Sequence, residues 1–154
     1  MRDREFVNRF CAFHLLPLDC YRGDMDDFLA RVLKHMNNCD AKALAQLSVE
    51  FRASLAHNFY LCGKHAFRQH PPGQPNRGVI NASLWDVMST GLSRYSEQTV
   101  TDRADAFRNA FYRLLADQAF IQAITYGPNH VRNVRCRFEK AKAMFQEVFG
   151  ADAT

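Results

Sequence analysis

The chain has 154 residues, of which 47% are hydrophobic, so it can bury a core without disulfides or a structural metal. Its first residues are charged, unlike a secretory signal, and no apolar run reaches the ~18 residues that a membrane span requires. Five cysteines, an odd number without disulfide-like spacing, indicate a reducing compartment. We therefore expect one compact domain, residues 1–154, in the cytoplasm, with no membrane insertion.

Almost every segment repeats apolar residues at helical spacing, and no stretch alternates as a strand would. The sequence predicts an all-α fold with six or seven helices. The first helix is expected at about residues 3–16, before Pro17, and the last near residues 131–148. Gly63 is expected to end the third helix. The side chains expected to cap helix N-termini are Asp24, Asp40, Asn81, Thr101 and Asp117.

One segment reads as a loop, at about residues 69–80. It contains "HPPGQPNRG", with three prolines and two glycines in nine residues. Both residue types interrupt regular helices and favour turns. We expect an irregular connection here, and this loop is the best candidate for a mobile hairpin tip.

The positive charge is concentrated in the expected last helix. The chain carries a net charge of +4, and residues 128–143 hold five cations against Glu139, so this stretch alone accounts for it. A cationic helix face can bind phosphates or an acidic protein, although a solvated helix face has the same composition. The candidate binding residues of this basic face are Arg132, Arg135, Arg137, Lys140 and Lys142.

Catalytic or metal chemistry has weak support in the sequence. Cys11 with His14, and Cys62 with His65, have a Cys-x-x-His spacing that zinc ligands use, but zinc ligands favour turns and Cys11 lies within a helical pattern. The run "GDMDD" is explained by helix capping. No phosphate-binding loop, nucleophile elbow or paired-carboxylate signature is present. We expect a protein that is not an enzyme and needs neither a metal nor a cofactor.

Five segments together resemble a known family. They are "DREFVNRFCAFHL", "YRGDMDDFL", "CGKHAFR", "INASLWDVM" and "AFIQAITYGPNHVRNVRCRFEKAK". In order and spacing they resemble the helical C-terminal part of the GmrSD-type restriction family, which comprises modification-dependent endonucleases and their relatives in phage defence. The positions that match as scaffold are Asp3, Arg4, Glu5, Gly23, Met25, Phe28, Asn81 and Arg135.

The resemblance implies a missing catalytic half. In that family a ParB-like α/β nuclease domain with an Asp-Gly-Gln-Gln-Arg motif precedes the helices, and the motif is absent here. Pro128 also departs from the hydroxyl residue expected after Gly127. If Met1 lies at the family's boundary between the two halves, the first helix lacks its usual cover. Its apolar face, Phe6, Phe10 and Phe13, is then expected to contact a partner or a second copy in a homodimer.

Two functions follow from this reading. The first is a non-catalytic interaction protein of phage–host conflict that binds and inhibits a defence nuclease complex, as anti-CRISPR and anti-restriction proteins do. The second is a nucleic-acid-binding helical subunit of a split GmrSD-type restriction system, with DNA or RNA as its ligand and the restriction nuclease as its partner protein. A compact single domain suits the inhibitor, whereas the basic helix suits the nucleic-acid-binding subunit.

Overall fold

The computed structural model describes residues 2–150, and all regular elements in this range are helical. The predicted all-α fold is confirmed for these residues, with eight α-helices in place of six or seven. Two short 3₁₀-helices, η1 (Leu18–Cys20) and η2 (Gly63–His65), complete the set. The α-helices are α1 (Arg2–Leu15), α2 (Met25–Asn37), α3 (Ala41–Cys62), α4 (Ala82–Leu92), α5 (Glu97–Asp102), α6 (Ala104–Ala116), α7 (Gln118–Thr125) and α8 (Val131–Phe149).

Four of the five predicted caps are confirmed. The side chains of Asp24, Asp40, Asn81 and Asp117 each accept hydrogen bonds from backbone N–H groups in the first turn of α2, α3, α4 and α7. These bonds satisfy donors that have no partner within the helix. Gly63 ends α3 with a positive φ of 54°, as predicted.

The predicted cap at Thr101 is wrong. Ser96 caps α5 instead, by accepting a hydrogen bond from the Thr99 N–H, and Thr101 lies inside that helix. The Thr101 hydroxyl donates to the carbonyl of Glu97, one turn back. The next helix, α6, begins after Arg103 without a side-chain cap. The short helix α5 is therefore the additional element.

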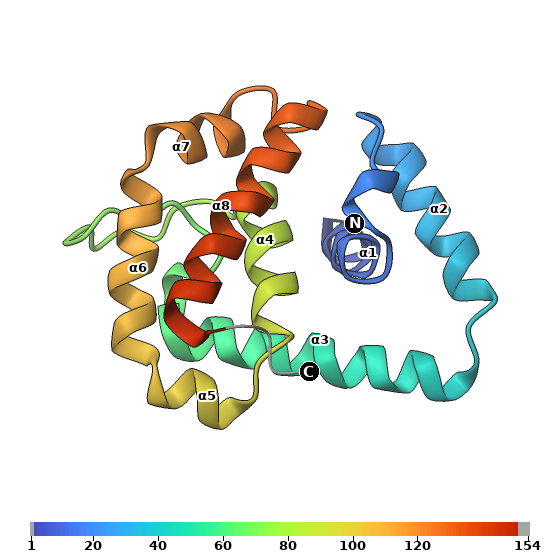
Figure 1. The fold of residues 1–154 in the computed structure, drawn as a ribbon, viewed down its shortest axis with the longest axis horizontal. Coiled ribbons are helices and arrows are strands. Elements are labelled where there is room, and N and C mark those ends of the chain that lie inside the picture. Colours follow the sequence, from blue (N-terminus) through green and yellow to red (C-terminus); the bar gives the residue numbers. More distant parts are fainter. Residues whose placement is uncertain (1, 151–154) are drawn as a thin grey trace.

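Two buried clusters form the core. One lies among α4–α8 and the C-terminal half of α3, and the other lies among α1, α2, η1 and the start of α8. Phe51 and Phe138 pack against both. Figure 1 shows α1 end-on between α2 and α4, with α3 running along one side of all three and α8 beside α4.

The phenylalanines of α1 are covered by the chain itself. Phe10 is 0% exposed and Phe13 is 6% exposed, while Phe6 is half-buried against the Trp85 ring. Phe13 also packs against Phe138 of α8. The expectation that Phe6, Phe10 and Phe13 form an open partner face is wrong, because α2, α3, α4 and α8 supply the cover. Homodimer formation stays a prediction, but this apolar face no longer supports it.

The last helix uses its apolar side for the core. This side forms an apolar seam, in which Val134, Ala141, Phe145 and Val148 are buried and Val131 and Phe138 are half-buried. The seam packs against α4, α6 and α7. It therefore has intramolecular partners.

Residues 66–81, between η2 and α4, form no regular element, and side chains hold this segment in place. The Arg68 guanidinium donates to the Gly78 carbonyl at 2.7 Å, and the Lys64 ammonium donates to the Pro75 carbonyl at 3.1 Å.

Among the helices of residues 2–150, none has the length and apolar character needed to cross a membrane.

Gly91 permits the close approach of α4 and α8. A Cβ added there would lie 2.1 Å from a ring atom of Phe145, which is buried among the Tyr95, Phe107 and Phe149 rings. We expect Gly91→Ala to lower the free energy of unfolding by about 1–3 kcal/mol, although alanine favours a helix by about 1 kcal/mol over glycine. Urea unfolding measures this loss. Gly78→Ala is the control, since its Cβ would meet its nearest atom at 3.9 Å; equal stability of the two variants would contradict the account.

Candidate binding cleft

A buried ion network joins the three central helices. The Asp86 carboxylate on α4 accepts two hydrogen bonds from the Arg9 guanidinium of α1, at 2.8 and 2.6 Å. It accepts a third from Arg137 of α8, at 2.8 Å. The side chains of Asp86 and Arg137 are fully buried and that of Arg9 is 5% exposed. Such charges are tolerated in a core only when they are paired and hydrogen-bonded.

The network extends to the turn between α7 and α8. Arg137 also donates to the Pro128 carbonyl, and the Tyr21 hydroxyl donates to the Asn129 carbonyl at 2.5 Å. Burial raises the pKa of the Tyr21 hydroxyl, so this group stays protonated and can donate. Pro128, where the resemblance expects a hydroxyl residue, thus contributes a backbone acceptor to the network.

The structure corrects the predicted basic face. Arg137 is fully buried and bound to Asp86, so it is not part of any surface. Lys140 is half-buried and donates to Asp117 at 2.7 Å, the residue that caps α7. Arg135 is exposed and lies 3.1 Å from Asp19. Of the five residues of the predicted basic face, Arg132 and Lys142 are exposed and form no ion pair within residues 2–150.

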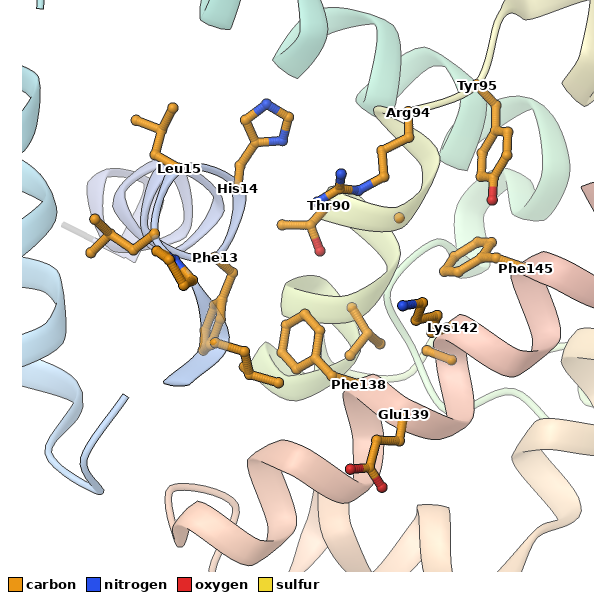
Figure 2. Close-up of a pocket in the computed structure, with 16 residues that line it drawn as sticks. Phe13, His14, Leu15, Thr90, Arg94, Tyr95, Phe138, Glu139, Lys142 and Phe145 are labelled. Atoms are coloured by element: carbon orange, nitrogen blue, oxygen red, sulfur yellow. The ribbon is translucent and has the colours of Figure 1, made fainter. Parts of the chain in front are cut away.

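A cleft of about 560 Å³ opens where the end of α1 meets α4 and α8 (Figure 2). This volume lies in the range of ligand-binding pockets. Phe13, Val87, Phe138 and Phe145 contribute apolar surface. The chain segment that leaves α1, residues 15–18, forms one wall with three leucines and Pro17.

Four groups near the rim of the cleft carry or can carry charge: His14, Arg94, Glu139 and Lys142. Arg94 and Lys142 are exposed, and within residues 2–150 neither forms an ion pair. In Figure 2 their side chains extend toward the middle of the cleft, whereas the Glu139 carboxylate points away from both. The cleft therefore combines an apolar interior with two exposed cations that form no ion pair within residues 2–150.

His14 links the rim to two other helices. Its Nε2 lies 2.7 Å from a Glu50 carboxylate oxygen on α3, and its Nδ1 lies 3.2 Å from the Ser93 hydroxyl. The Ser93 hydroxyl donates to the Thr90 carbonyl at 2.7 Å. The Phe10 ring stacks on the imidazole at 5.0 Å. These contacts fix the orientation of His14 at one end of the cleft.

The cysteines of the two Cys-x-x-His pairs have raised thiol pKa values. Cys11 is 4% exposed, and burial raises its pKa. Burial also raises the pKa of Cys62 to about 11, so this thiol is protonated near neutral pH. Within residues 2–150, no three His, Cys, Asp or Glu side chains are grouped so that they could hold a metal ion. The acidic run of residues 23–27 supplies the cap of α2.

Sequence reasoning missed Asp86, Arg9 and Arg94. Asp86 stands inside "LWDVM", a run in which all its neighbours are apolar, and that position signals a buried carboxylate in need of a cationic partner. Arg9 lies one residue before Phe10 on the covered side of α1. Arg94 follows the end of α4 and carries no local signal, since only the fold brings it to the cleft.

Comparisons of the chain with known family models, curated proteins and solved structures find no match.

The buried network gives the first prediction for this region. Arg137→Ala leaves the Asp86 carboxylate with one of its two cationic partners and opens space in the core, so we expect a loss of about 3–5 kcal/mol in unfolding free energy. Arg132→Ala, on the exposed side of the same helix, should stay within about 0.5 kcal/mol of the parent. Chemical denaturation compares them, and similar midpoints for the two variants would refute the importance of the network.

The Lys140–Asp117 pair gives a pH-dependent prediction. The hydrogen bond from Lys140, followed by that from the Phe120 N–H, lowers the pKa of Asp117 in the folded chain. The pair therefore stabilises the fold above the ordinary aspartate pKa of about 3.9, and this contribution is lost as pH falls through the lower folded value.

We expect Lys140→Ala to cost less than about 1 kcal/mol at pH 7, since the pair is partly exposed to solvent. The difference from the parent should shrink as acid protonates Asp117. Thermal unfolding between neutral and acidic pH measures it, and a difference independent of pH would show that the ion pair contributes nothing.

Proposed function

We propose that this chain is a non-catalytic interaction protein that binds and inhibits a defence nuclease complex, with the cleft between α1, α4 and α8 as its partner-binding site. The observation that carries the proposal is the pair of cations, Arg94 and Lys142, which extend into an apolar cleft without an ion pair of their own in residues 2–150. A surface of this kind suits an acidic protein partner.

The setting of the cleft supports a pre-formed binding surface. Asp86 on α4 accepts hydrogen bonds from cations on α1 and α8, the other two helices that line the cleft. His14 is held by Glu50 and Ser93. A surface that needs little reorganisation loses less free energy on binding than a flexible one. Inhibitors that act by occupying a partner surface benefit from such rigidity.

The second candidate is the nucleic-acid-binding subunit of a split GmrSD-type restriction system. Arg132 and Arg135 are exposed on the N-terminal half of α8, and the exposed pair of Arg135 with Asp19 is readily exchanged for a phosphate contact. Phosphate binding by these residues would make affinity fall steeply with salt, by about 0.9 in log K per neutralised phosphate for each tenfold rise in salt.

A phage-plating assay tests the proposed inhibition. The chain is expressed in a panel of strains, each of which carries one restriction or CRISPR nuclease system, and unmodified phage is plated on them. We expect the parent chain to restore plating on at least one strain, because the nuclease complex is occupied. Charge reversal with Arg94→Glu and Lys142→Glu should abolish the restoration, since the acidic partner is then repelled.

The matched control is Lys42→Glu with Arg52→Glu, which reverses two exposed cations on α3, outside the cleft. This variant should restore plating as well as the parent does. Failure of the parent on every strain, or full activity of the cleft variant, would overturn the proposal. Loss of activity with Arg132→Glu and Arg135→Glu alone, together with salt-sensitive duplex binding, would favour the split restriction subunit.

A further inference from the structure

We infer that the ligand of the cleft is an acidic peptide segment of the partner, which inserts an apolar side chain between the walls and places a carboxylate between Arg94 and Lys142. The inference deepens the proposed function and rests on it for the partner's identity. It commits to a protein ligand in preference to a nucleic acid or a small anion.

One wall of the cleft is aliphatic. Leu15, Leu16 and Leu18 are half-buried and line the wall formed by the end of α1. Phe13 and Phe145 are 6% and 5% exposed and present little surface, while Phe138 is half-buried. Apolar side chains of a peptide pack well against such a wall.

The same arrangement disfavours a nucleic acid. Proteins that bind single strands offer exposed aromatic faces on which bases stack, whereas here Phe13, Tyr95 and Phe145 are buried and Phe138 is half-buried. A continuous phosphate backbone needs a run of cations, whereas this rim carries the Glu139 carboxylate beside its two cations. A peptide can place a single acidic group between Arg94 and Lys142 and leave Glu139 in solvent.

The geometry of the two cations defines the acidic contact. Arg94 follows the C-terminal end of α4 and Lys142 lies on α8, so they approach the cleft from two different elements (Figure 2). The Thr90 hydroxyl, which also belongs to the lining of the cleft, is already used, since it donates to the Asp86 carbonyl at 2.6 Å. The ligand's acceptor is therefore expected to bind the guanidinium and the ammonium and not this hydroxyl.

The test uses a random peptide library displayed on phage and selected against the full chain. We expect the selected peptides to combine Asp or Glu with Leu, Ile, Phe or Met. One such peptide, synthesised with a fluorescent label, should bind the parent chain with an affinity at least about tenfold higher than that for the Arg94→Glu, Lys142→Glu variant, a difference of about 1.4 kcal/mol. The Lys42→Glu, Arg52→Glu variant should bind it as the parent does.

Competition separates the other occupants. Inorganic phosphate and a DNA duplex, added at low salt, should leave the labelled peptide bound. Displacement by either, selected peptides without acidic residues, or equal binding to the cleft variant would overturn the inference. Because the selection involves no nuclease, an acidic peptide that binds in the cleft while no defence system is relieved would reject the proposed function alone.

Discussion

The arrangement of the central helices depends on the buried ion network around the Asp86 carboxylate. This carboxylate lies in the core with no exposure, and two guanidinium groups from α1 and α8 satisfy its oxygens. Burial of the carboxylate and the two guanidinium groups costs hydration free energy. This cost is offset only when all three groups keep their hydrogen-bonded positions. The second guanidinium charge is balanced by Glu5, which lies 3.7 Å from Arg9, and Arg137 also donates to the Pro128 carbonyl in the turn before α8.

This network connects the two halves of the core. Arg9 belongs to a helix whose apolar face packs with α2, whereas Asp86 lies on α4, whose apolar residues belong to the cluster of α4–α8. The Trp85 indole reinforces the junction by donating to the Phe6 carbonyl at 2.8 Å. The cleft opens at this junction. Its walls come from α1, α4 and α8, the three helices that the buried ion network joins. Contacts that fix the core also fix the relative positions of α8 and the end of α4, from which the two cationic side chains extend.

Local features of the fold could be predicted from the sequence, and long-range ones could not. Asp24, Asp40, Asn81 and Asp117 cap helices because the cap bond joins near neighbours in the chain. The cap at Thr101 is wrong because Ser96, five residues earlier, can also cap a helix and nothing in the local sequence separates the two. The apolar face of α1 was identified, but its cover by α4 and α8 depends on residues more than 70 positions away.

The basic face shows that the number of cations along a helix does not reveal which of them are buried or paired. Arg137 follows Val134 by three residues and precedes Ala141 by four, so helical spacing alone assigns it to the buried side. Its partner Asp86 is 51 residues away, which explains why a charge count along α8 missed the pairing. Arg94 became part of the candidate site only through the packing of α4 against α8.

Native-state hydrogen exchange tests the central claim most directly, that buried charge makes α1, α4 and α8 one cooperative unit. The account predicts that the slowest amides of all three helices exchange with the same opening free energy and the same dependence on denaturant. Exchange of α1 together with α2 at a distinctly lower free energy, while α4 and α8 remain protected, would contradict it, because the ion network would then fail to bind the two halves of the core to each other.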